Sequence, residues 1–160
     1  MTITTEEIEQ ALVTWGNGKI AISKAFEEGG IEAARSVASA NLDAYYGYDL
    51  GPVLFKPTMA SGEQTFRPTK PGALAYFCGH SEDYPRDNGF AIMGWRATEN
   101  ITAATFVQGD IAMWMGWIRL TDRNGSVTTV DKSFGYKKDG AGILRIVLHH
   151  SSLPYMPPET

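Results

Sequence analysis

The amino-acid sequence predicts an α+β domain in which N-terminal helices pack on one face of a mostly antiparallel sheet. Apolar residues recur every three or four positions up to about residue 45, as on one face of a helix. After residue 52 the period falls to near two, and from about residue 89 turn signals separate the predicted strands. Because 160 residues correspond to about one domain, we expect 1–160 to form a single domain.

The first forty-five residues predict two helices. Thr4 and Glu7 fit a capping box, in which each side chain bonds a backbone N–H of the first turn. Lys19 takes one position of the apolar stripe that an apolar residue would be expected to fill. The stripe consists of Ile8, Leu12, Trp15, Ile22 and Phe26. Glu28-Gly29-Gly30 ends this helix, and a second helix follows with Ile31, Ala34, Ala38, Leu42 and Tyr45 on its apolar face.

Short strands and one short helix follow. Residues 53–58 predict a strand that Pro57 confines to a sheet edge or a bulge, and 71–77 a helix with Pro71 in its first turn. The predicted meander has strands at 89–98, 101–107, 111–121, 126–137 and 143–151. The strand at 111–121 is apolar on both faces, which predicts a central strand that is buried on both sides.

Composition excludes several classes of function. A net charge of −4 disfavours nucleic-acid binding, which requires a basic face. No apolar stretch approaches the roughly 20 residues of a membrane helix, and the N-terminus lacks the pattern of a signal peptide. We therefore expect a soluble, cytoplasmic protein that contacts neither nucleic acid nor membrane.

The sequence predicts neither a metal site nor a cofactor. Cys78 is the sole cysteine and is expected to be a buried, inert thiol. His149 and His150 are adjacent in a strand, so they point to opposite faces and cannot chelate one ion together. The chain also lacks a phosphate-binding loop and a dinucleotide fingerprint.

The candidate functional residues lie in the last three strands. Arg119 lies on an apolar strand face with Met113, Met115 and Trp117, and a buried cation requires an anion or a wet cavity. By alternation His150 shares the face of Leu144, Ile146 and Leu148, and Asp131 shares a face with Ser133.

Two interpretations of these residues remain open. Arg119 and Asp131 form a cross-strand ion pair with His150 at the rim, or Arg119 and His150 line a pocket for a small carboxylate, which a guanidinium binds bidentately. The remaining candidate ligand-binding residues are Ser133, Asp131, Trp117, Trp95 and Tyr76.

At these strands the sequence resembles the association (hub) domain of calcium/calmodulin-dependent protein kinase II, a member of the nuclear transport factor 2-like (SnoaL-like) superfamily. The resemblance is carried by Phe55-Lys56-Pro57, Gly109-Asp110, Trp117-Ile118-Arg119-Leu120-Thr121, Lys138-Asp139-Gly140 and His149-His150-Ser151-Ser152-Leu153-Pro154. It implies a strongly curved sheet wrapped around the long first helix, a cone-shaped α+β barrel, and assembly through the sheet.

The resemblance also implies a site. The hub pocket binds small carboxylates through arginines. Its central-strand arginine matches Arg119, its second falls near Ser133 and its third at His150, while its pocket histidine falls near Ala73.

Three functions follow from these observations. The first is a homo-oligomeric small-molecule binding domain, at least dimeric. The second is an acid–base enzyme of isomerase, dehydratase or cyclase type, with His150 or Asp131 as proton carrier. The third is an assembly module with a vestigial pocket.

Overall fold

The fold is a five-stranded sheet with helices packed against one face. The computed structural model describes residues 1–159. In chain order its helices and strands are α1 (Thr5–Tyr45), β1 (Leu54–Lys56), α2 (Lys70–Cys78), β2 (Trp95–Gln108), β3 (Ile111–Asp122), β4 (Val127–Lys138) and β5 (Leu144–Ser152). Single 3-10 turns at 62–64 and 90–92 flank α2.

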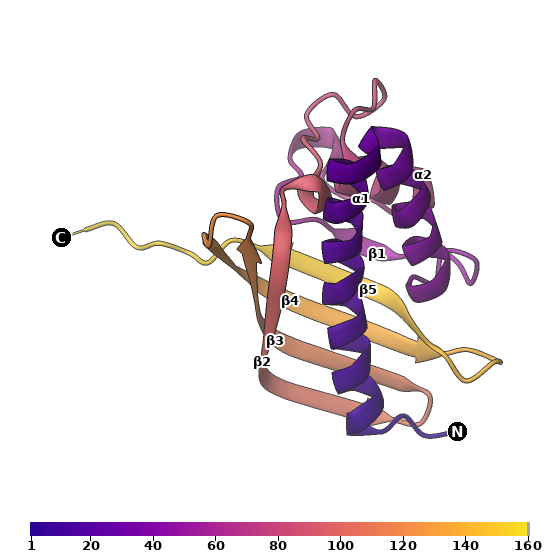
Figure 1. Cartoon of the computed structure of the whole chain (residues 1–160). Helices are drawn as coiled ribbons and strands as arrows, with labels where there is room; N and C mark the ends of the chain where they lie inside the picture. Colours follow the sequence, from indigo (N-terminus) through magenta and orange to yellow (C-terminus); the bar gives the residue numbers. More distant parts are fainter. Residues whose placement is uncertain (160) are drawn as a thin grey trace.

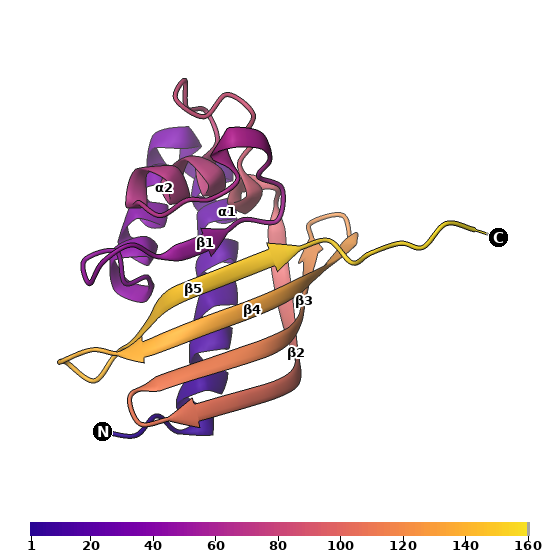
Figure 2. The same ribbon diagram turned by 180° about the vertical axis from the view of Figure 1, so that it is seen from behind.

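The strand order is β1-β5-β4-β3-β2, antiparallel except for the parallel pair β1 and β5. In Figure 1, α1 crosses the concave face of the sheet, and Figure 2 shows the opposite face free of helices. The predicted α+β class, with N-terminal helices in the concave face of a curved, mostly antiparallel sheet, is confirmed.

Both predicted helices are present within α1. Thr4 Oγ1 accepts from the Glu7 amide at 3.2 Å, and the Glu7 carboxylate accepts from the Thr4 amide at 2.8 Å, which confirms the capping box. Gly30 breaks the helix, with φ 78° and ψ −167°, a backbone conformation that glycine adopts without strain. The break brings the second half back beside the first, where the Asn41 side chain contacts the backbone carbonyl of Gly18.

The prediction of separate strands at 89–98 and 101–107 is wrong. Residues 90–92 form a 3-10 turn, and β2 then runs without interruption from Trp95 to Gln108. Two irregularities in its pairing with β3, between Trp95 and Ala97 and between Thr102 and Ala104, interrupt the alternation on which the prediction depended.

The prediction that 111–121 is buried on both faces is also wrong for the single chain. Residues facing α1, such as Trp114 and Ile118, are buried, whereas Met115 and Trp117 on the other face are 59% and 48% exposed. The helices cover only one face of the sheet, so the second apolar face of β3 lies open.

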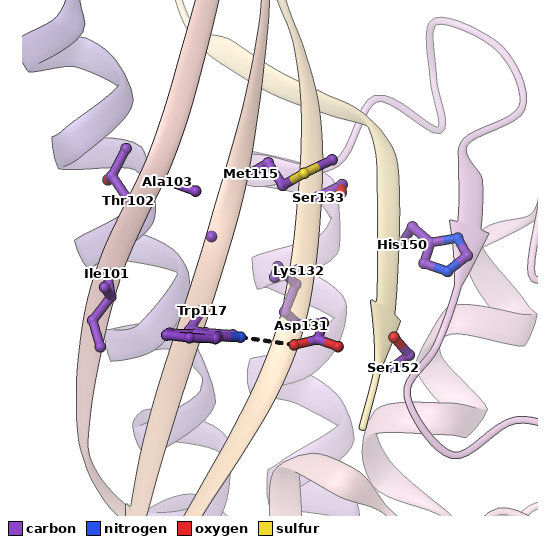
Figure 3. Close-up of a pocket in the computed structure, with 11 residues that line it drawn as sticks. Ile101, Thr102, Ala103, Met115, Trp117, Asp131, Lys132, Ser133, His150 and Ser152 are labelled. Carbon is purple, nitrogen blue, oxygen red and sulfur yellow. Dashed lines mark hydrogen bonds between the residues drawn. The ribbon is translucent and has the colours of Figure 1, made fainter. Parts of the chain in front are cut away.

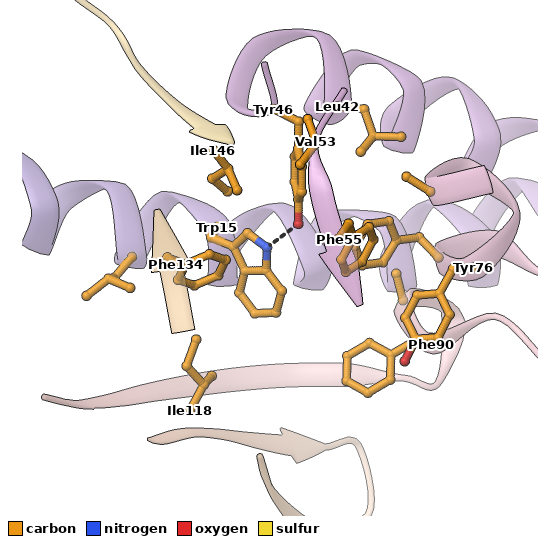
Figure 4. Close-up of a cluster of buried hydrophobic side chains, with 14 of the residues drawn as sticks. Trp15, Leu42, Tyr46, Val53, Phe55, Tyr76, Phe90, Ile118, Phe134 and Ile146 are labelled. Atoms are coloured by element: carbon orange, nitrogen blue, oxygen red, sulfur yellow. Dashed lines mark hydrogen bonds between the residues drawn. The ribbon is translucent and has the colours of Figure 1, made fainter. Parts of the chain in front are cut away.

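The core lies between α1, α2 and the concave face, and it is rich in aromatic rings (Figure 4). Phe55 packs between Tyr76 and Phe77 of α2 on one side and stacks on His149 on the other, at a ring-centroid distance of 4.3 Å. No helix among the described residues combines the length and hydropathy that crossing a membrane requires.

Candidate functional site

A group of polar side chains lies inside the cone, where apolar packing would be expected. Lys19, Lys132, His149 and Ser151 are each no more than 3% exposed. Together with Thr58, whose hydroxyl bonds that of Ser151 at 2.6 Å, they form the inner polar cluster. The cluster joins α1, β4, β5 and the segment after β1, so the whole fold is needed to assemble it.

Strand register brings the β4 and β5 members together. Lys132 is the cross-strand partner of Ser151, and Phe134 is that of His149, so all four side chains face α1. From α1, Trp15 and Lys19 lie one turn apart on the face that meets the sheet. The ammonium groups of Lys19 and Lys132 lie 4.8 and 4.4 Å from the centre of the Trp15 ring.

A β-bulge determines which histidine points inward. Gly135 pairs with Leu148 but Tyr136 pairs with Ile146, so Val147 is an extra residue on β5. The extra residue places buried His149 on the face of Ile146 and leaves His150 exposed on the other face. The expectation that His150 shares the face of Ile146 is therefore wrong, although the two histidines do point to opposite faces.

Hydrogen bonds connect the inner polar cluster to the aromatic core. The Trp15 indole N–H donates to the Tyr46 hydroxyl at 3.0 Å (Figure 4). The same hydroxyl lies 2.8 Å from His149 Nδ1, and His149 Nε2 lies 2.9 Å from Lys132 Nζ. These contacts form one continuous chain from α1 to β4.

The two buried lysines have no anionic partner in the described part of the chain. The ion pairs among residues 1–159 use other cations. Burial lowers the pKa of Lys19 to about 7. Burial, followed by the charge on Lys19, lowers the pKa of Lys132 well below its usual range, and burial and both lysines lower that of His149. Protonation of these groups is therefore unfavourable until an anion enters the site and balances the positive charge.

Hydroxyl groups line one side of the inner polar cluster. Besides Thr58 and Ser151, the Tyr76 hydroxyl accepts from the Met59 amide at 3.2 Å. Burial raises the pKa of Tyr76 to about 12, so this phenol stays protonated and able to donate near neutral pH. Lys56 donates to the Ser151 carbonyl at 2.9 Å and closes this side of the cluster.

Four of the sequence-predicted site residues line a different feature, on the convex face. Trp117, Asp131, Ser133 and His150 border a groove of about 630 Å³, with Ile101 and Met115 among its apolar walls (Figure 3). We call it the outer groove. The Trp117 indole N–H donates to Asp131 at 2.8 Å, the contact marked in Figure 3. The sheet separates this groove from the inner polar cluster.

The other predicted residues are dispersed. Arg119 lies on the convex face and contacts Glu99 at 3.7 Å, so the expected Arg119–Asp131 ion pair is wrong. Trp95 is buried, and its indole N–H donates to the Phe90 carbonyl at 2.7 Å. Tyr76 lies in the core beside the inner polar cluster.

Sequence reasoning missed the two lysines of the inner polar cluster, Lys19 and Lys132. Lys19 was visible as a polar residue at an apolar position of a helical stripe, and this was the available signal. Lys132 alternates with Val130 and Phe134 on β4 and has the same signature. Among residues 1–159, no three His, Cys, Asp or Glu side chains gather closely enough to hold a metal ion.

The architecture is that of the nuclear transport factor 2-like superfamily, as the sequence predicted. An NTF2-like protein from Pseudomonas putida KT2440 superposes with a TM-score of 0.54 at 16% identity, covering 94% of this chain and 87% of that one. An NTF2-like superfamily protein from Salmonella enterica superposes with a TM-score of 0.54 at 16% sequence identity, covering 96% of this chain and 92% of that one. Similarity at this level defines the fold.

A narrower match identifies the family. The model of the family described as metal-independent carbonic anhydrase matches residues 6–153, and the chain belongs to that family. It is 47% identical over 153 residues to a metal-independent carbonic anhydrase of Nostoc sp., covering 96% of this chain and 75% of that protein. A crystal structure of a cyanobacterial iota-carbonic anhydrase complexed with bicarbonate superposes with a TM-score of 0.96 at 46% identity, over 98% and 95% of the chains.

Proposed function

We propose that this protein catalyses the reversible hydration of carbon dioxide to bicarbonate at the inner polar cluster. The observation that carries the proposal is the pair of buried lysines, Lys19 and Lys132, which both lie against the Trp15 ring and have no carboxylate partner among residues 1–159. Family membership and the bicarbonate complex of a 46% identical structure support it.

A small anion would balance the positive charge of a protonated lysine in this site. Buried cations are costly unless an anion or hydrogen-bond acceptor meets them. Lys132 makes one hydrogen bond, to His149, so N–H groups remain for a ligand oxygen. The hydroxyls of Thr58 and Ser151 lie on the same side and supply donors for a planar, three-oxygen anion.

The same residues supply the proton transfers that hydration requires. The oxygen of water bonds to the carbon of carbon dioxide, and water must release a proton to leave bicarbonate. Burial lowers the pKa of Lys132 and His149, which favours the uncharged forms that can accept that proton. The rings of Phe55 and Phe77 give the site an apolar wall that suits carbon dioxide.

Stopped-flow measurement of carbon dioxide hydration with a pH indicator tests the proposal. We expect catalysis by the native protein and a loss of about 10²-fold or more in Lys132→Met, which removes the proton acceptor and keeps the shape. Lys137→Met, on the exposed part of the same strand, is the matched control. A folded native protein without catalysis, or full activity in Lys132→Met, would contradict it.

We also propose that the convex face of the sheet contacts a second copy of this chain. Phe106 of β2 and Ile111, Met113, Met115 and Trp117 of β3 expose apolar side chains there, on a face without helices (Figure 2). Apolar patches of this kind mark interfaces, and a two-fold contact would pair the face with itself. Sedimentation is expected to show a dimer or larger for the native protein and a monomer for Trp117→Glu; a native monomer at micromolar concentration would refute it.

A further inference from the structure

The chain of hydrogen bonds through Tyr46 limits where His149 can carry its proton. An indole N–H is only a donor, so the Tyr46 oxygen accepts from Trp15. Within residues 1–159 the other hydrogen bond of this hydroxyl is to His149 Nδ1. The hydrogen of Tyr46 is therefore satisfied only if it points at Nδ1, which must then be unprotonated.

The neutral ring then carries its proton on Nε2, facing Lys132. Nε2 lies 2.9 Å from Lys132 Nζ, so the amine must accept this hydrogen through its lone pair and must be uncharged. The opposite tautomer, with the proton on Nδ1, gives Tyr46 two donors and leaves its own buried hydrogen without an acceptor. One arrangement alone satisfies all four groups.

We infer that Trp15 and Tyr46 are positioning residues that hold His149 in the Nε2–H tautomer and thereby keep Lys132 uncharged. The Lys132 amine accepts a proton when its single lone pair turns away from His149 Nε2–H, so the hydrogen bond between the two groups breaks as the proton arrives. The inference rests on the proposed carbon dioxide hydration. Neither residue is required to touch the substrate. Each acts on Lys132 indirectly, through the chain of hydrogen bonds that runs from Trp15 through Tyr46 and His149 to the Lys132 amine.

This arrangement also favours release of the proton once it has been accepted. A protonated Lys132 directs a hydrogen at Nε2–H, so two donors face each other until the proton leaves or the tautomer changes. The contact with His149 Nε2–H should therefore lower the basicity of the Lys132 amine. The other titratable group inside the cone beside this pair is Lys19 from α1, with Cys78 of α2 next to it; His150, on the opposite face of β5, acts on His149 only through its charge.

The tautomer is measurable without any assay of activity. In protein labelled with ¹⁵N-histidine, long-range ¹H–¹⁵N correlation distinguishes the protonated from the unprotonated ring nitrogen. We expect His149 of the native protein to show an unprotonated Nδ1 and a protonated Nε2. A protonated Nδ1 in the native protein overturns the inference, whether or not the protein hydrates carbon dioxide.

Tyr46→Phe tests the positioning role, with Tyr48→Phe as its control. The Tyr48 ring stacks on that of Tyr46 at 6.0 Å, but its hydroxyl donates to the Arg67 carbonyl and does not touch His149. In Tyr46→Phe we expect a mixture of His149 tautomers. We also expect the hydration rate to fall off with decreasing pH about one pH unit earlier than in the native protein, so that the rate is about tenfold lower at acidic pH and equal to the native rate at higher pH.

The outcomes separate the two proposals. If folded Tyr46→Phe has the same His149 tautomer and the same pH dependence of hydration as the native protein, the positioning role is overturned. A native protein with the Nε2–H tautomer and no hydration activity refutes the proposed function and leaves the tautomer assignment standing. If Tyr46→Phe does not fold, the tautomer of the native protein decides.

Discussion

Replacing Lys19 by methionine should stabilise the protein at neutral pH, against the usual cost of a core substitution. Lys19 is 1% exposed on α1 and has no ion-pair partner. Burial lowers its pKa from 10.5 to about 7 in the folded state. Methionine keeps the length of the side chain and removes the group that must lose its proton or its hydration on folding.

The pKa difference sets the size of the effect. Between pH 7 and 10.5 the unfolded chain binds the Lys19 proton and the folded chain does not, so stability rises with pH in this window. At about 1.4 kcal/mol per unit, the cost of Lys19 is about 4 kcal/mol at pH 7, is largest below pH 7 and vanishes above pH 10.5. Part of the gain is offset by lost contacts of the ammonium with Trp15 and Phe77, so we expect about 2–4 kcal/mol.

Urea unfolding from pH 6 to pH 10, in buffers freed of bicarbonate, measures the difference. Lys19→Met should be more stable than the native protein at pH 7 and should converge with it towards pH 10. Lys24→Met, at an exposed position of the same helix, should change stability by less than about 0.5 kcal/mol at every pH. If Lys19→Met is less stable at pH 7, or its effect does not vary with pH, the reasoning from an unpaired buried cation fails.

Three further changes test other parts of the structure. Asp87→Ala should cost about 3–5 kcal/mol by urea unfolding, because it leaves the Arg67 guanidinium buried without its bidentate partner; an effect under 1 kcal/mol would contradict the burial of that pair. Gly135→Ala should cost about 1–3 kcal/mol and perturb the histidine NMR signals, because its new Cβ would lie 2.8 Å from that of Leu148 at the bulge; an unchanged spectrum would argue against the bulge. If Arg119 serves a carboxylate site on the convex face, a small carboxylate should raise the melting temperature of the native protein but not of Arg119→Ala, and no shift with any acid would end that hypothesis.

Much of the fold was predictable because its signals are local. The capping box at Thr4 and Glu7, the glycine break at Gly30 and the change of period after residue 52 each depend on a few neighbouring residues. The start of β2 was not predictable in this way. Its irregular pairing with β3 disturbs the alternation from which strands are recognised.

The candidate site was harder to predict because a bulge has no local signature. Strict alternation from Ile146 puts His150 inside, and one extra residue at Val147 reverses the result. The glycine that permits the bulge, Gly135, lies on the neighbouring strand, where its missing Cβ allows Leu148 to approach. The site thus depends on the contact between Gly135 and Leu148, which lie 13 positions apart, and the hydrophobic periodicity of a single strand carries no information about such a contact.

The stability cost of the inner polar cluster is itself an argument about function. Lys19 and Lys132 lie against Trp15 with no ion-pair partner among residues 1–159, so this core should be less stable than the same core with methionine at those positions. Buried networks that break the rules of packing are expected at functional sites, where a ligand supplies what the protein lacks. If bicarbonate binds at the cluster, as proposed, it supplies a negative charge, so it should raise the stability of the native protein and have a smaller effect on Lys19→Met. The variant that gains stability would then respond less to the anion, which links the buried lysine to anion binding.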